Sequence, residues 1–243
     1  MHVLIAGAGR GIGLAMVEQL LREERWRRVY AVHRSEAPEL AALAGQDARL
    51  QCLQVDQSSD AALAELRGAV DGELNWVINT AGMLHSERLG IGPEKALQHL
   101  DRRALQELFS TNAINHALLV QALHPHLSRR GELKLASLSA RVGSIGDNRL
   151  GGWYAYRASK AALNQLMRTL AIELRRHNKQ SVCVTLHPGT TDTVLSRPFQ
   201  QRVPPEQLFS AERAARQLLH VLDDLNPDQT GGFFAWDGQS IPW

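Results

Sequence analysis

Cysteine is scarce in this sequence of 243 residues, which has only Cys52 and Cys183, each within an apolar stretch and neither in a C-x-x-C pair. This scarcity predicts two buried, reduced thiols. No apolar run approaches the ~20 residues that a membrane-spanning helix needs, and the N-terminus lacks the charged leader of a secretory signal. The ten histidines show no metal-ligand spacing with acids or cysteines. We therefore expect a cytoplasmic protein with no membrane partner and no bound metal.

An excess of charge of one sign is also missing. The formal net charge is +2, with 21% charged and 44% hydrophobic residues, a balance that indicates a globular protein and no nucleic-acid partner. Linkers, repeats and low-complexity blocks do not occur. The length suits one α/β domain, so we predict a single domain over residues 1–243.

Short apolar runs alternate with longer helical patterns along the chain. The apolar runs predict seven strands, at 3–6, 29–32, 50–55, 74–79, 133–138, 181–187 and 232–236. The clearest helical patterns lie at 105–127, 154–176 and 211–224. This alternation indicates βαβ units. We predict a Rossmann-type, doubly wound α/β fold, with a mostly parallel seven-stranded sheet, helices on both faces and three αβα layers.

The first strand runs into a glycine-rich turn, G-A-G-R-G-I-G at 7–13, which a helical pattern follows. Glycine permits a tight turn and lets a pyrophosphate approach the backbone, while the N-terminus of the next helix attracts anions. A glycine pattern alone is weak evidence. Its position at the first strand–helix junction of an alternating chain predicts a dinucleotide-binding site.

The end of the second strand lacks the acid that would hold a ribose 2′-hydroxyl and repel a 2′-phosphate. The strand runs instead into His33-Arg34-Ser35, and Arg10 lies within the glycine turn. Two guanidinium groups suit a phosphate, so we predict NADP(H) as the cofactor, with NAD(H) as the less favoured alternative. Asp56 ends the third strand, where it can accept a hydrogen bond from an adenine amino group or act as a turn acid.

The segment W-Y-A-Y-R-A-S-K at 153–160 holds two tyrosines and one lysine in a helical pattern. Tyr156 and Lys160 are four residues apart and share a helix face, whereas Tyr154 lies mostly on another side. A nearby ammonium lowers the pKa of a phenol from its ordinary value of roughly 10. Such a phenol can donate a proton to a carbonyl oxygen, or remove it in the reverse reaction. This pair alone is common, so its meaning depends on the other motifs.

Together these motifs form an ordered set that resembles the classical short-chain dehydrogenase/reductase family over nearly the whole chain, from Val3 to Trp243. The set comprises the glycine turn, Asp56, N-T-A-G at 79–82, Asn112, a serine-containing fifth strand, Y-R-A-S-K at 156–160 and H-P-G-T-T-D-T at 187–193. Two further stretches, G-G-W-Y-A-Y-R-A-S-K-A-A-L-N and F-F-A-W-D-G-Q-S-I-P-W, look most like the branch that contains the C-factor signalling protein and sniffer-type carbonyl reductases.

The resemblance implies a role for each matching position. Tyr156 would be the general acid/base, Lys160 would lower its pKa and bind the nicotinamide ribose, and Asn112 would anchor a water in a proton relay. The implied cofactor contacts are Gly7, Gly9, Arg10, Gly11, Ile12, Gly13, Arg34, Asp56, Gln57, Asn79, Ala81, Gly82, Tyr156, Lys160, Pro188, Gly189, Thr191 and Thr193.

The resemblance also implies a serine hydroxyl that polarises the substrate carbonyl, and the family usually places it three residues before the glycine that follows the fifth strand. Here that position, counted back from Gly143 in S-L-S-A-R-V-G, is Ala140. A shift of one residue within a strand turns a side chain to the other face, although a loop can absorb the shift. We favour Ser139 as the catalytic serine, with Ser137, Ser144 or no serine as the alternatives.

The resemblance implies an NADP(H)-dependent oxidoreductase that transfers hydride between nicotinamide and a carbonyl or alcohol substrate. Residues 190–210 would cover that substrate, with Leu195, Phe199 and Leu208 as an apolar lid. The alternative is a dinucleotide-binding regulatory or signalling protein with vestigial catalysis. Family members are usually dimers or tetramers, so we expect a homo-oligomer.

Overall fold

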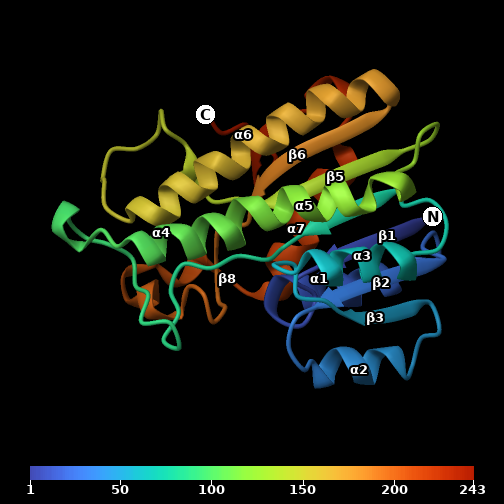
Figure 1. Cartoon of the computed structure of the whole chain (residues 1–243), viewed down its shortest axis with the longest axis horizontal. Helices are drawn as coiled ribbons and strands as arrows, with labels where there is room; N and C mark the ends of the chain where they lie inside the picture. Colours follow the sequence, from blue (N-terminus) through green and yellow to red (C-terminus); the bar gives the residue numbers. More distant parts are fainter.

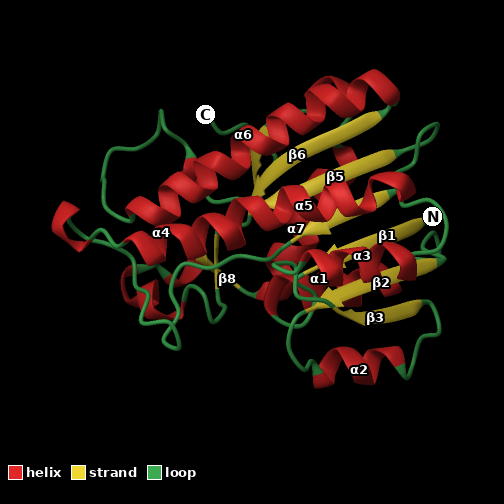
Figure 2. Cartoon of the chain, viewed as in Figure 1, coloured by secondary structure: helices red, strands yellow, loops and turns green.

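The computed structural model describes residues 1–243, apart from the side chain of Arg202. Its main sheet has seven strands, and every neighbouring pair is parallel (Figure 2). In sheet order the strands are β3 (Leu50–Gln54), β2 (Arg28–His33), β1 (His2–Ala6), β4 (Trp76–Asn79), β5 (Leu133–Leu138), β6 (Ser181–His187) and β9 (Phe233–Ala235). This architecture confirms the predicted doubly wound fold.

The strand order reverses direction between β1 and β4, because β2 and β3 lie on one side of β1 and β4 to β6 on the other. In open parallel sheets the carboxyl ends of the strands on the two sides of such a reversal form the ligand crevice. The glycine turn follows β1, and N-T-A-G begins with the last residue of β4. The fold therefore places both motifs at the same crevice.

Helices cover both faces of the sheet (Figure 1). They are α1 (Gly11–Leu21), α2 (Pro38–Ala44), α3 (Asp60–Ala69), α4 (Arg102–Phe109), α5 (Asn115–Leu123), α6 (Tyr154–His177) and α7 (Ala211–Asp224). Side chains alternate along each strand, so both faces of the sheet are apolar. In β1, Val3 and Ile5 pack in the core with α1, α2 and α7, and Leu4 and Ala6 pack in the core with α3, α5 and α6.

The helix expected at 105–127 is present, but it is not α-helical throughout. It begins at Arg102, where the Asp101 side chain accepts a hydrogen bond from the backbone of Ala104. A π-helical turn, Ser110–Ile114, then separates α4 from α5, and Asn112 is at its centre. A π turn inserts one residue without removing the apolar periodicity, so the sequence pattern reads as a single helix.

The segment 190–210 contains more regular structure than the sequence predicts. Two short strands, β7 (Thr190–Thr191) and β8 (Leu208–Phe209), pair in parallel as a second small sheet. The 3-10 turns Arg197–Arg202 and Pro205–Gln207 lie between them. This pairing joins the two ends of the segment, so it leaves and rejoins the body of the molecule at one place.

Candidate active site

The glycine turn approaches the N-T-A-G segment too closely for larger residues. Gly7 has φ +80°, and a Cβ there would lie 2.6 Å from Oγ1 of Thr80. A Cβ at Gly13 would collide with the carbonyl oxygen of Gly7. Thr80 in turn donates a hydrogen bond to the carbonyl oxygen of Ala6, at 2.9 Å. These glycines therefore let the start of α1 and the end of β4 meet.

The N-terminus of α1 has features that suit an anion. Arg10 precedes the helix in extended conformation, its side chain does not cap the first turn, and that turn contains no acid. Unpaired backbone N–H groups and the helix dipole favour a negative group at such a terminus. A Cβ at Gly11, φ +56°, would lie 3.4 Å from Cγ2 of Thr193, so the segment after β6 reaches the glycine turn.

The corner beyond β2 is basic. Arg10 and Arg34 are both exposed, and in the described part of the chain neither guanidinium has a salt bridge or side-chain hydrogen bond. Asp56 accepts hydrogen bonds from the backbone N–H and the hydroxyl of Ser58, which lower the pKa of its carboxyl group. Asp56 therefore acts as a turn acid, and its contact with adenine stays a prediction. Two free cations beside a glycine turn fit a 2′-phosphorylated dinucleotide.

The N-T-A-G segment is held by its own first residue. Asn79 is buried, its Nδ2 donates to Oε1 of Gln57 at 2.9 Å, and its Oδ1 accepts from the backbone of Ala81 at 3.0 Å. Gln57, Asn79 and Ala81, which are all implied as cofactor contacts, are thus connected by hydrogen bonds. This arrangement fixes the loop that follows β4.

Tyr156 and Lys160 face the interior from the first two turns of α6. Tyr156 is 7% exposed and Lys160 3%, whereas Tyr154 is 39% exposed and lies on the other side, as predicted. The Lys160 ammonium donates to the carbonyl oxygen of Leu138 at 2.8 Å and lies 5.9 Å from the centre of the Tyr156 ring. A Cβ at Gly82 would lie 3.5 Å from Nζ of Lys160. The fold therefore brings the end of β4, the end of β5 and α6 together at one point.

Burial dominates the electrostatics of this pair. It lowers the pKa of Lys160 to about 7 and raises the pKa of the Tyr156 phenol above its ordinary value. The direction for Tyr156 is opposite to the one that the i,i+4 spacing predicts. The physical reason is that both groups lose solvation together, and a lysine that is only partly protonated near neutral pH gives less support to a phenolate.

Asn112 is fully buried, and its side chain forms three hydrogen bonds. Its Oδ1 accepts from the backbone N–H of Met83 at 2.7 Å, and its Nδ2 donates to the carbonyl oxygen of Met83 at 2.8 Å and to Oγ of Ser159 at 3.0 Å. Asn112 therefore connects the π turn to the loop after β4 and to α6. Its role in a water relay stays a prediction.

The serines near the end of β5 have hydrogen-bond partners within the protein. Ser139 is 4% exposed, and its hydroxyl donates to Oδ1 of Asn164 at 2.7 Å. Ser137 lies against Nδ1 of His116 at 3.0 Å, and Ser144 accepts a backbone N–H. The role of Ser139 toward a substrate carbonyl stays a prediction.

An aromatic cluster lies over Tyr156. The ring centres of Trp153 and Phe199 are 5.1 Å apart, and those of Trp153 and Tyr156 are 6.2 Å apart. Leu195 and Phe199 pack in this cluster as predicted, but Leu208 forms β8 instead. Nε2 of His85 lies 3.2 Å from the carbonyl oxygen of Leu195, which connects the 190–210 segment to the loop after β4. The segment therefore contacts the apolar cluster that contains Tyr156.

The remaining predicted positions lie where β6 ends. Gly189 has φ +73°, and a Cβ there would lie 2.7 Å from the ring of Phe209. Thr191 is buried and donates to the carbonyl oxygen of Pro188 at 3.3 Å. These contacts fix the turn that leads from β6 into the segment 190–210.

Two further predicted positions lie near the end of β1: Gly9 is in the glycine turn, and Ile12 is in the first turn of α1.

Two buried polar residues were missed by the sequence analysis. Glu94 is 4% exposed, its carboxylate accepts from the backbone of Ala155 at 3.3 Å, and its carbonyl oxygen accepts from Trp153. These hydrogen bonds fix Trp153 just before the start of α6. Trp153 is the one non-glycine residue with positive φ (51°) in the described backbone. His116 lies between Ser137 and the carbonyl oxygen of Ala81. No local pattern predicts contacts between segments so far apart in sequence.

Acid should destabilise the protein without cofactor through His116. Burial, with a smaller contribution from the charge of Lys160, lowers its pKa from 6.5 to about 3. Above pH 6.5 the imidazole is neutral in both the folded and the unfolded chain. Below that pH the unfolded chain binds the proton first, so stability falls progressively toward pH 3. We expect a loss of about 2 kcal/mol between pH 7 and pH 5 from this group.

Thermal unfolding at several pH values, for the wild type and for His116→Asn, measures this loss. Asparagine keeps a donor and an acceptor but does not titrate. The melting temperature of the variant should fall less between pH 7 and pH 5. An equal fall in both proteins would show that other groups cause the acid sensitivity.

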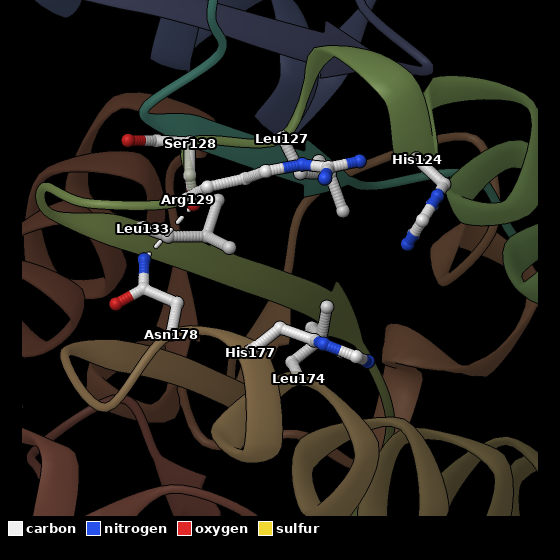
Figure 3. Close-up of a pocket in the computed structure, with 8 residues that line it drawn as sticks. All are labelled: His124, Leu127, Ser128, Arg129, Leu133, Leu174, His177 and Asn178. Carbon is white, nitrogen blue, oxygen red and sulfur yellow. Dashed lines mark hydrogen bonds between the residues drawn. The ribbon is translucent and has the colours of Figure 1, made fainter.

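A separate small cavity of about 100 Å³ lies at the start of β5 (Figure 3). His124, Arg129 and His177 line it, and Asn178 closes one side by donating to the carbonyl oxygen of Ser128 at 2.9 Å. Leu133, the first residue of β5, also lines it, so the cavity is at the amino edge of the sheet. It is therefore at the opposite end of β5 from Tyr156.

Among the described residues, no group of three or more histidine, cysteine or acidic side chains could hold a metal ion, and no helix could cross a membrane.

Comparison with known proteins identifies the family of this chain. The family model for short chain dehydrogenases matches residues 1–204. C-signal of Myxococcus xanthus is 33% identical over 172 residues, which cover 71% of this chain and 94% of that protein. The chain therefore belongs to the short-chain dehydrogenase family.

Two solved structures share the whole fold. NADPH-bound carbonyl reductase from chicken fatty liver has a TM-score of 0.88 and 28% identity, with 100% of this chain and 98% of that chain covered. Carbonyl reductase Sniffer of D. melanogaster has a TM-score of 0.87 and 26% identity, with 100% and 99% covered. These neighbours, with C-signal, agree with the branch that the sequence resembles.

Proposed function

We propose that the protein is an NADP(H)-dependent reductase of small carbonyl compounds, or an alcohol dehydrogenase in the reverse direction. The observation that carries this proposal is the buried Tyr156–Lys160 pair at the carboxyl edge of the sheet, beside a glycine turn that suits a pyrophosphate. NADPH in the related chicken reductase supports the choice of cofactor. We propose one domain over residues 1–243, in which residues 190–210 cover the substrate.

The residues present fit the dinucleotide. The glycine turn and the N-terminus of α1 would hold its pyrophosphate, Arg10 and Arg34 its 2′-phosphate, and Lys160 its nicotinamide ribose. When bound, it supplies the hydride that is added to the carbonyl carbon. The remaining steps belong to the side chains of this chain.

Tyr156 would donate its hydroxyl proton to the carbonyl oxygen as the alcohol forms. Burial raises the pKa of the phenol, which keeps it protonated and ready to donate near neutral pH. The phenolate that remains lies near Lys160, and a phenolate in turn favours the protonated lysine. A proton from solvent then restores the phenol. The cluster of Trp153, Leu195 and Phe199 would exclude water and accept an apolar substrate.

A second candidate function is that of a dinucleotide-binding regulatory protein with vestigial catalysis. The observation that favours it is the Ser139 hydroxyl, which is bonded to Asn164 within the protein. The similarity to C-signal adds weight to this candidate.

We also propose a homo-oligomer in the cytoplasm. Apolar side chains are exposed on the π turn and on α6, at Ile114 (48%), Leu166 (39%) and Ile172 (50%), which suits contact between long helices of two copies. Both cysteines are free thiols, as a reducing compartment requires.

The experiment that tests the proposed function is a calorimetric titration with NADPH and NADH, followed by NADPH oxidation across a panel of carbonyl compounds. We expect NADPH to bind at least about tenfold more tightly than NADH, because each charge-assisted hydrogen bond contributes about 1.5–3 kcal/mol. Turnover of a panel member supports the reductase. Tight NADPH binding without turnover supports the regulatory protein, and no binding of either cofactor contradicts both.

A further inference from the structure

At the end of β5, the neighbouring residues Ser139 and Ala140 direct their side chains to different places. The backbone at Ser139 is still in the sheet, because its N–H donates to the carbonyl oxygen of Leu186 on β6 at 2.8 Å. Ala140 is also extended, with φ −142° and ψ 146°. Consecutive side chains of an extended chain point to opposite sides. Ser139 and Ala140 therefore face different surroundings.

Ser139 faces the middle of α6. Its hydroxyl donates to Asn164, and Nδ2 of Asn164 lies 3.4 Å from the carbonyl oxygen of Gly143. Asn164 comes eight residues after Tyr156 on the same helix, a rise of about 12 Å. This bonded set connects β5, the turn after it and α6. Ser139 thus has a structural role.

Ala140 faces the apolar cluster that contains the tyrosine. It is half-buried and packs in this cluster with Tyr156, Trp153 and Leu195. Any residue at position 140 would direct its side chain into the same cluster. The side chain present there is a methyl group, which cannot donate a hydrogen bond.

We infer that Ala140 is a specificity-determining residue: position 140 supplies no hydroxyl donor to the cluster that contains Tyr156, and the site therefore selects carbonyl groups that are already electron-poor. The inference rests on the proposed function. A hydrogen-bond donor aimed at a developing oxyanion contributes a factor of about 10²–10³ to kcat. Without that donor, an electron-withdrawing group on the substrate has to stabilise more of the negative charge on oxygen. Activated ketones are the substrate class that this site fits.

Two acetophenones test the inference, because they have similar shapes and differ in electron withdrawal: para-nitroacetophenone and para-methoxyacetophenone. The proteins are the wild type, Ala140→Ser, Ala140→Cys and Ser139→Ala, each with NADPH. Cysteine matches serine in size but is a weak donor, so it controls for volume. The measurements are kcat/KM for each ketone, NADPH affinity and melting temperature.

We expect the wild type to prefer the nitro compound strongly. Ala140→Ser should raise kcat/KM for the methoxy compound by about tenfold or more and reduce the preference, whereas Ala140→Cys should not. Ser139→Ala should keep both kcat/KM values within about twofold. It should also lower the melting temperature by several degrees, because it leaves a buried acceptor on Asn164 without its donor.

Three results would overturn the inference. One is an Ala140→Ser protein that binds NADPH as the wild type does and gains no activity. Another is an equal gain in Ala140→Cys. The third is a loss of about 100-fold in Ser139→Ala with its melting temperature unchanged, which would make Ser139 the donor.

The outcomes also separate this inference from the proposed function. Turnover in Ala140→Ser but not in the wild type would show that position 140 lacks the donor, but it would overturn the selection of electron-poor ketones and leave the wild type a regulatory protein. Turnover in the wild type with no gain in the variant overturns the inference alone. Absence of turnover in both proteins, with NADPH bound, overturns both.

Discussion

Replacing Tyr156 by phenylalanine should lower kcat for carbonyl reduction by about 10²–10⁴-fold, the usual contribution of a positioned general acid. The affinity for NADPH should stay within about threefold, because the change removes one hydroxyl and keeps the ring that packs against Trp153. Ala140 offers no second hydroxyl in the same cluster, so the loss should be near the upper end of this range. Steady-state NADPH oxidation and calorimetric titration measure the two quantities.

Tyr154→Phe is the matched control. Tyr154 belongs to the same helical turn, loses the same atom and is 39% exposed on another side of α6. Its kcat should equal that of the wild type. A Tyr156→Phe protein with full turnover would refute the acid/base assignment, and equal losses in both variants would indicate a general disturbance of α6.

Replacing Arg34 by aspartate should reverse the choice of nicotinamide cofactor. The change removes an exposed guanidinium beyond the end of β2 and supplies the acid that holds a ribose 2′-hydroxyl. Loss of a charge-assisted hydrogen bond of about 1.5–3 kcal/mol, with repulsion of the 2′-phosphate added, should weaken NADPH binding by about 100-fold. NADH should then bind at least as tightly as NADPH.

Arg27→Asp controls for the change in net charge. Arg27 is also exposed, but it lies just before β2, at the other end of the strand from the glycine turn. Its effect on NADPH affinity should be small and should disappear in high salt. Unchanged NADPH affinity in Arg34→Asp would mean that Arg10 alone, or another group, binds the phosphate.

The features that sequence analysis predicted correctly are local ones. Strand positions agree with the structure to within two residues, and α6 begins at Tyr154 as expected. The i,i+4 spacing placed Tyr156 and Lys160 on the buried face, because helical geometry relates these positions directly. The glycine turn was recognised because Gly7 and Gly11 occur at a strand–helix junction, where a positive φ is needed.

The features that the sequence did not predict concern how segments meet. The sequence left open which face Ser139 presents, because the face of a residue at a strand end depends on where the strand stops relative to its neighbours. In the structure the pairing with β6 continues through Ser139, which directs its hydroxyl to Asn164. The pKa of Tyr156 was predicted to fall, yet burial of the phenol raises it, and burial is a property of the whole fold.

The sequence by itself determined the class of this protein: a parallel doubly wound sheet, a glycine turn for a dinucleotide and a tyrosine–lysine pair on one helix face. These features depend on residues within a few positions of one another. Only the tertiary structure decided which side chains surround Tyr156, because the end of β5, the start of α6 and the 190–210 segment meet there across long sequence separations. The contacts of Glu94 with Trp153 and Ala155, and the place of Ala140 in the cluster that contains Tyr156, follow only from that meeting.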